Sequence, residues 1–222
     1  MNKLGQTVKK NNAKKEVYHQ IVQTAHNLFI ERGIKDVKMD DIAAELSVSK
    51  RTIYELFNDK EQLLREVLVY QNVMMHERGM EIVRSSSHIL DIILKLYNLH
   101  FELLKKVNNK FFAELNKYPE ICKHKKNEED KNMKKFVAWM ELGRKQGLFR
   151  QDADFEILVF ILKRDLMTII EVKMQTGHTE LIKFTPEELG RKLILFYLRG
   201  ISTPKGQEII EEYLKRNETI IQ

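Results

Sequence analysis

The residues best suited to chemistry lie in one six-residue segment, which reads SKRTIY from Ser49 to Tyr54. It holds two adjacent cations, Lys50 and Arg51, beside three hydroxyl groups. An arginine can donate two parallel hydrogen bonds to guanine, and hydroxyls and lysines suit phosphate oxygens. Both cations fall in the first turn of a predicted helix, where the helix dipole disfavours them unless an anion lies nearby. Isolated surface cations are usually just solvated, so the surrounding elements decide whether this segment contacts a nucleic acid.

Those elements are two short helices that share an apolar frame. The sequence DIAAELSVSKRTIYELF runs from Asp41 to Phe57, and its apolar residues recur at helical spacing on both sides of a short interruption. The frame consists of Ile42, Ala43, Leu46, Val48, Ile53 and Phe57. Ala43 matters because its small side chain allows the helices to approach closely. The pattern predicts a helix-turn-helix, whose second helix would present its N-terminal residues to the major groove of DNA.

Helical periodicity continues before and after this pair. A stripe of apolar residues from Val17 to Phe29 predicts a first helix that stops at Gly33. Ser49 can cap the third helix, and a fourth helix begins after Asp59. Further helices are expected over 88–106, 109–117, 119–147, 153–176, 186–199 and 205–217. No strand-like alternation is long enough to build a sheet, so the expected fold is all-α.

The composition agrees with long helices. Only nine glycines and three prolines occur among 222 residues, and this argues against a turn-rich β-fold. The share of apolar residues, 43%, excludes wholesale disorder. A single cysteine fits a reducing compartment. The start of the chain is polar and no apolar run approaches the roughly 20 residues that cross a bilayer, so we expect a cytoplasmic protein with no membrane partner.

The net charge of +6 is unevenly distributed along the chain. Residues 1–15 hold five lysines and no acid, whereas residues 16–64 hold nine acidic and six basic side chains. Bulk charge therefore does not indicate DNA binding by the first folded domain. If this domain binds DNA, a few cations at particular positions must make the contacts. These are Lys50, Arg51 and Lys60, the last of which lies at the start of the fourth helix. The basic tail would add attraction that is independent of sequence.

Motifs of enzymes and metal sites are missing from the sequence. It contains no glycine-rich nucleotide-binding motif, and its seven histidines include no H-E-x-x-H. Cys122 and His124 are close, but two ligands do not make a zinc site. Glu128, Glu129 and Asp130 have the character of a solvated acidic run. We therefore expect no catalysis, no metal and no cofactor.

Residues 17–64, and especially VKMDDIAAELSVSKRTIYELFNDKEQLL from Val37 to Leu64, resemble the tetracycline-repressor (TetR) family of bacterial regulators. The resemblance implies that Thr52, Tyr54 and Lys60 contact the DNA backbone. It also implies that Lys50 and Arg51 can reach bases. The expected DNA-binding residues are Lys38, Ser49, Lys50, Arg51, Thr52, Tyr54 and Lys60.

Two positions depart from the family pattern. Lys38 stands where the family usually has a serine or threonine that caps the second helix, so that cap must come from elsewhere or be weaker. Ser47 replaces the usual turn glycine, at a cost of about 1 kcal/mol if the position has a positive φ. Neither change removes an expected DNA contact.

The expected domains are a basic flexible tail over 1–15, a helix-turn-helix domain over 16–62 and a larger helical domain over 63–222. The resemblance implies that the last of these binds an effector and forms a homodimer. A broad apolar character in the predicted helices 153–176 and 186–199 supports such an interface, with ordinary core as the alternative. The expected interface residues are Phe155, Leu158, Val159, Leu162, Leu166, Ile169, Leu193, Phe196 and Tyr197.

Methionine and aromatic side chains between residues 65 and 150 could line an adaptable apolar pocket, although ordinary core is again the alternative. The candidate pocket residues are Met74, Tyr97, His100, Phe101, Phe136, Trp139 and Met140. The sequence thus predicts a ligand-responsive repressor that binds a palindromic operator as a homodimer, with a small apolar or amphipathic effector. Two alternatives stay open: a DNA binder of the same fold without an effector, and a helical ligand- or protein-interaction module that does not use its helix-turn-helix.

Overall fold

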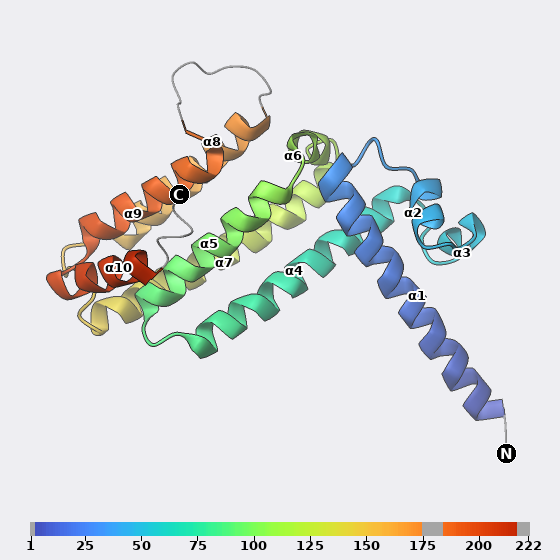
Figure 1. Ribbon diagram of the computed structural model, residues 1–222, viewed down its shortest axis with the longest axis horizontal. Coiled ribbons are helices and arrows are strands. Elements are labelled where there is room, and N and C mark those ends of the chain that lie inside the picture. The colour runs from blue at the N-terminus through green and yellow to red at the C-terminus, as the bar shows by residue number, and fades with distance from the viewer. Residues whose placement is uncertain (1–2, 175–183, 217–222) are drawn as a thin grey trace. The chain divides into compact units, whose positions relative to one another are not determined.

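The computed structural model describes residues 3–174 and 184–216 of the chain. Over these residues the chain forms ten α-helices and one isolated bridge between Phe149 and Ser202, without any strand (Figure 1). The helices are α1 (Lys3–Arg32), α2 (Met39–Glu45), α3 (Lys50–Tyr54), α4 (Lys60–Ser85), α5 (Ile89–Lys106), α6 (Asn109–Leu115), α7 (Pro119–Lys145), α8 (Phe155–Met174), α9 (Pro186–Ile201) and α10 (Pro204–Arg216). The expectation of an all-α fold is confirmed.

Helix α1 begins earlier than its apolar stripe predicts. A flexible tail is expected over 1–15, but α1 already starts at Lys3, and only residues 1 and 2 of that tail lie outside the described range. The tail is rich in lysine and carries no proline, so a helix that is already formed can extend into it at little cost. At its other end α1 stops at Gly33, whose φ of +91° is a conformation that glycine adopts readily.

The chain divides into two compact units. The first comprises residues up to Glu77 together with Val107–Ile121, and the second comprises Arg78–Lys106 and the residues from Cys122 onward. The predicted division at residue 62 differs from this one, because α4 continues without interruption through that point. Helix α6 also belongs to the first unit, although its place in the sequence puts it within the expected C-terminal domain.

The core of the first unit contains the predicted helix-turn-helix frame. Ile42, Ala43, Ile53 and Phe57 are at most 5% exposed. Leu46 and Val48 pack against them and are half-buried. The apolar frame inferred from helical spacing is therefore the one that holds α2 and α3 together.

Helix α6 buries Phe111 and Leu115 in the core of the first unit, and polar contacts also attach it to the end of α1. The backbone N–H of Asn108 donates to the carbonyl of Ile30 at 2.7 Å, and its side-chain amide donates to the carbonyl of Glu31 at 3.0 Å. These carbonyls lie in the last turn of α1, where no partner within the helix is available. The Glu114 carboxylate accepts the N–H of Lys35 at 2.7 Å, just beyond that end. Helix α6 thus closes the C-terminal end of α1.

The second unit is built around α5, α8, α9 and α10, which pack on one another. Its buried core includes Leu90, Ile93, Met140, Phe149, Leu158, Ile194, Leu198 and Ile210. Helix α9 packs tightly on α5 at Gly190, where a Cβ atom would lie 1.9 Å from the ring of Phe101. A glycine is required there because the aromatic ring occupies the space of a side chain.

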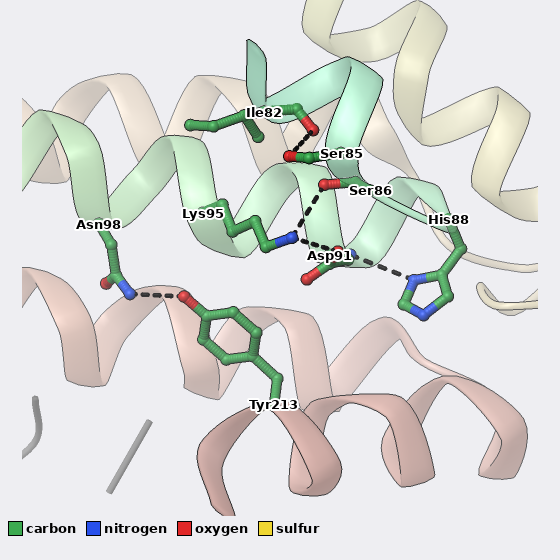
Figure 2. A network of polar contacts seen from close by, with 8 residues as sticks. All are labelled: Ile82, Ser85, Ser86, His88, Asp91, Lys95, Asn98 and Tyr213. Atoms are coloured by element: carbon green, nitrogen blue, oxygen red, sulfur yellow. Dashed lines mark hydrogen bonds and ion pairs between the residues drawn. The ribbon is translucent and has the colours of Figure 1, made fainter. Parts of the chain in front are cut away.

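A polar network lies at the N-terminal end of α5 (Figure 2). His88 Nδ1 accepts the N–H of Asp91 at 3.2 Å and so caps the helix. The Lys95 ammonium donates to the Asp91 carboxylate at 2.7 Å and to the Ser86 hydroxyl at 3.2 Å. One turn further along, the amide of Asn98 donates to the hydroxyl of Tyr213 on α10 at 2.6 Å (Figure 2). These contacts hold the start of α5 against the turn that follows α4 and hold its middle against α10.

The close approach of α5 and α9 generates a stability prediction. We expect Gly190→Ala to lower the free energy of unfolding by about 1–3 kcal/mol, because the new methyl group overlaps the Phe101 ring. Gly200→Ala is the matched control on the same helix, since a Cβ there meets nothing within 4 Å and alanine favours helix formation. Urea unfolding of both variants checks this. Equal stability of the two variants would show that Phe101 moves aside without cost.

Candidate functional site

The turn between α2 and α3 has the geometry that a helix-turn-helix requires. Ser47 adopts a positive φ of 54°, so the suspected departure from a glycine turn is real. The backbone N–H of Val48 donates to the carbonyl of Ala43 at 3.0 Å, which closes the end of α2. A non-glycine residue in this conformation costs about 1 kcal/mol or more. The buried frame on both sides of the turn must offset that cost.

The start of α2 is capped by an acid instead of a serine or threonine. Lys38 is the N-cap residue, and its ammonium cannot accept a hydrogen bond from the helix. The carboxylate of Asp41 accepts the N–H of Lys38 at 2.7 Å instead. The cap is therefore one half of a capping box, in agreement with the expectation that it comes from elsewhere or is weaker. The exposed side chain of Lys38 stays at the surface of the domain.

The start of α3 is capped as the sequence predicts. The hydroxyl of Ser49 accepts the N–H of Thr52 at 3.1 Å. The two hydroxyl groups also lie 2.8 Å apart and share a hydrogen bond. Both side chains are thus fixed at the N-terminal end of α3, where backbone N–H groups favour an anion.

Lys50 is tied to the neighbouring helix. Its ammonium lies 2.8 Å and 2.9 Å from the two carboxylate oxygens of Asp40 on α2. It also lies 6.0 Å from the ring centre of Tyr54, which is itself 45% exposed. The hydrogen bond to Asp40 raises the pKa of Lys50 above its usual value. The ammonium of Lys50 is therefore kept in place at the surface by its ion pair with Asp40.

Arg51 is the most exposed of the predicted DNA-binding side chains for which an exposure is measured. Its side chain is 88% exposed, and its Nε donates to the Glu55 carboxylate at 2.9 Å. Within the described part of the chain, its two terminal nitrogens donate to no other group. Those nitrogens carry the donors that can bind the edge of a guanine.

Lys60 lies differently from the position that the resemblance implies. Its ammonium donates to the backbone carbonyls of Val37 and, at 3.3 Å, Lys35, and it lies 5.7 Å from the ring centre of Phe29. Burial lowers the pKa of Lys60, against the opposing effect of the nearby Glu114 carboxylate. The prediction that this ammonium is a surface contact for phosphate is therefore revised. The side chain is occupied in the loop between α1 and α2, a role that sequence spacing could not indicate.

The candidate pocket residues are not gathered at one cavity. Met74 belongs to the first unit, whereas the other six belong to the second. Phe101 and Met140 are buried in its core, and His100 is exposed with its Nδ1 2.7 Å from the carbonyl of Leu96. The remaining three, Tyr97, Phe136 and Trp139, are half-buried. The alternative of ordinary core is thus correct for Phe101 and Met140, because neighbouring helices already cover them.

Two open grooves are present in the second unit, and neither involves the candidate pocket residues. The larger has a volume of about 670 Å³ and follows α9 from Lys192 to Ile201. The smaller, of about 400 Å³, is lined by Ser87, His88, Gln146, Leu148, Lys205 and Ile209. Among the residues that the structure describes, no group of three or more His, Cys, Asp or Glu side chains could hold a metal ion. No helix of the described ranges is long and apolar enough to cross a membrane.

Several residues expected at the dimer interface are part of the core of their own chain. Phe155, Leu158, Val159, Leu162 and Ile169 are all at most 9% exposed. Other parts of the same chain already cover these five side chains, so they have little surface left to offer a second copy. Leu193 and Tyr197 are half-buried.

The outward faces of α8 and α9 carry other apolar side chains. Phe196 is 74% exposed and Leu166 is 36% exposed, so both stay available for an interface. Ile157 and Phe160 are not among the expected interface residues, yet they are 56% and 68% exposed on α8. Their spacing of three residues marks a second face of a helix that is apolar on nearly all sides. The apolar residues on this second face of α8 could have been recognised in the sequence as interface candidates.

Comparison with known proteins agrees with the geometry of the first unit. Residues 21–67 match the family model described as bacterial regulatory proteins, tetR family. A relative, the HTH-type transcriptional repressor KstR2 of Mycolicibacterium smegmatis, is 24% identical over 198 residues, which cover 85% of this chain and 92% of that protein.

Solved structures show the same fold. A transcriptional regulator from Saccharomonospora viridis, solved in complex with choline, has a TM-score of 0.71 at 22% identity and covers 85% of this chain and 99% of that one. The fatty acid degradation regulator FadR from Bacillus halodurans has a TM-score of 0.59 at 19% identity, with coverages of 82% and 94%. Residues 21–67 of this chain are thus a helix-turn-helix domain of the kind found in the tetR family of bacterial regulatory proteins.

Proposed function

We propose that the protein is a repressor that binds a palindromic DNA operator as a homodimer and responds to a small organic effector. The observation that supports this best is the side chain of Arg51, which projects into solvent from the second helix of a helix-turn-helix. Such a helix enters the major groove with its N-terminal residues toward the bases. Arg51 would read a guanine through its terminal nitrogens.

The backbone contacts that we propose come from α3 and the start of α2. Thr52 and Tyr54 place hydroxyl groups beside the exposed face of α3, and Ser49 holds Thr52 in position. Lys50 can exchange part of its contact with Asp40 for a phosphate oxygen. The exposed Lys38 adds a cation at the N-terminal end of α2. We leave Lys60 out of this set, because loop carbonyls already occupy its ammonium.

A homodimer follows from the limited reach of one reading helix. Two such helices on a twofold axis would read half-sites about 34–36 Å apart, or a multiple of that distance. The outward faces of α8 and α9 supply exposed apolar side chains, chiefly Ile157, Phe160 and Phe196, that would be buried between two copies. Apolar area of this kind favours association.

An effector would bind in the second unit. The half-buried aromatic residues Tyr97, Phe136 and Trp139 are suited to an apolar or amphipathic ligand. The S. viridis protein binds choline and the B. halodurans protein is named for fatty acid degradation, so an organic effector fits the relatives. A second candidate is constitutive DNA binding without an effector, which the tight burial of Phe101 and Met140 favours.

Selection from a pool of randomised DNA duplexes with the full chain tests the DNA-binding proposal. We expect recovery of a palindrome whose half-site centres are about 10 base pairs, or a multiple, apart. The reason is that two symmetry-related copies of α3 must meet the same groove pattern. Recovery of no preferred sequence would contradict the function as a sequence-specific regulator. Release of the selected duplex by a small molecule would separate the effector-dependent form from the constitutive one.

Lys38 is exposed whereas Lys60 is bound by loop carbonyls, so the two should affect the salt dependence of DNA affinity differently. Lys38→Met should reduce the slope of log affinity against log salt by about 0.9 for each phosphate that the side chain no longer neutralises. Lys60→Met should leave that slope unchanged but lower the free energy of unfolding by about 1–3 kcal/mol, because two loop carbonyls lose their donor. Titration of the selected duplex at several salt concentrations, with parallel urea unfolding, distinguishes the two. An equal decrease of the slope in both variants would restore Lys60 as a phosphate contact.

The proposed interface predicts a loss of association. Phe160→Glu and Phe196→Glu should each convert the dimer into a monomer in multi-angle light scattering, because a carboxylate would be buried without a partner. Leu142→Glu is the control, since Leu142 is 49% exposed on α7, outside the proposed interface. A folded Phe160→Glu or Phe196→Glu variant that stays dimeric would place the interface elsewhere.

A further inference from the structure

The two cations of α3 are paired with acids in different ways. Lys50 is held by Asp40 on another helix, through both carboxylate oxygens. Arg51 is held by Glu55, the C-cap residue directly after α3, through Nε alone. The first arrangement pulls the ammonium back toward α2. The second fixes one side of the guanidinium and leaves the terminal nitrogens directed to solvent.

The contact of Arg51 with Glu55 leaves the groups needed for base recognition available. A guanidinium has five N–H donors in a rigid plane, and only the one on Nε is used here. Recognition of guanine O6 and N7 needs two parallel donors, which the terminal nitrogens can supply. An unsupported arginine side chain must lose much rotational freedom to make that contact. A partner on Nε would limit this freedom as the groove displaces water from the pair.

Helix stability does not explain the pair. Along a helix, an acid four residues before a base is the favourable order, whereas here Arg51 precedes Glu55. The helix dipole also disfavours a cation in the first turn and an acid at the C-terminal end. In addition, a carboxylate on the exposed face of α3 would repel DNA phosphates. The placement thus gives little helix stability and lowers general affinity for DNA, whereas a role in base recognition would account for it.

We propose that Glu55 is a positioning residue for Arg51, which holds the guanidinium plane in the orientation that reads a guanine and thereby sets sequence specificity at that base pair. This inference rests on the proposed function, in which Arg51 reads the base. In free protein both side chains are largely exposed, at 88% and 59%, so the pair is weak and screened by salt. In the groove, where water is displaced, the same contact becomes stronger.

A double-mutant cycle on the full chain tests this role. Affinity is measured for the selected palindrome and for a duplex that is changed symmetrically at the base pair where Arg51→Ala loses discrimination. Glu55→Ala should lower the ratio of the two affinities at least roughly threefold, as expected for residues in direct contact. It should also raise affinity for an unrelated duplex, because a negative charge is removed. In the Arg51→Ala background, Glu55→Ala should leave the ratio unchanged.

The conservative variant separates orientation from charge. Glu55→Gln keeps a side-chain oxygen that accepts the Nε–H of Arg51 and removes the charge. We expect it to keep the discrimination ratio within about twofold of the parent, while it raises affinity for the unrelated duplex as Glu55→Ala does. Glu45→Ala is the matched control for charge, because Glu45 is an exposed acid on α2. It should leave the discrimination ratio unchanged.

Three outcomes would overturn the inference. If Glu55→Ala changes affinity for all duplexes by the same factor, Glu55 only repels DNA. If Glu55→Ala still changes the ratio in the Arg51→Ala background, Glu55 reads a base itself, as a carboxylate can with the amino group of cytosine. If selection yields no preferred duplex, the proposed function fails and this inference falls with it. A recovered palindrome with unchanged discrimination in Glu55→Ala overturns the positioning role alone.

Discussion

The first unit, with its helix-turn-helix, is called the reading head here. It depends on the loop between α1 and α2. This loop leaves α1 at Gly33 in a left-handed conformation and reaches α2 within a few residues, so its backbone groups have no regular helix or sheet to satisfy them. Side chains from elsewhere supply the partners: Glu114 accepts the N–H of Lys35, and Lys60 donates to the carbonyls of the loop. The contact to the carbonyl of Val37 is partly buried, so its loss would cost the most of the three. The direction of α2, and with it that of α3, follows from these contacts.

This constraint makes α6 a structural part of the reading head. Asn108 closes the last turn of α1, and an ion pair of 2.8 Å between Lys110 and Asp36 lies beside it. Lys110 holds the pKa of Asp36 below its usual value, so this acid stays charged near neutral pH. A helix-turn-helix cut off at residue 62 would lack these partners. The natural folding unit of this domain is therefore made from two separate stretches of the chain.

Local features of the structure were predictable, and contacts between distant residues were not. Helical spacing and caps placed nearly all helices, and the strained turn at Ser47 followed from a missing glycine. The position of Lys60 depends on carbonyls more than twenty residues away, and the attachment of α6 depends on residues still further off. No periodicity encodes such pairs. Helix α8 shows a different limit: when a helix is apolar on nearly all sides, spacing alone cannot tell Leu158, which is buried, from Phe160, which is exposed.

The charge pattern of α2 and α3 fits the proposed selectivity for DNA, although residues 16–64 are net acidic. Asp40 and Glu55 compensate Lys50 and Arg51 before any contact is made, so these two cations add little general attraction to phosphate, which the lysines of residues 3–15 would supply instead. Non-specific binding depends mainly on unpaired cations. A cation that is already paired with an acid adds to the affinity for DNA only where a group of the duplex can replace the acid or bind the donors that the acid leaves unused. In the proposed function, discrimination between sequences would then depend more on the orientation of a few side chains than on the net charge of the surface.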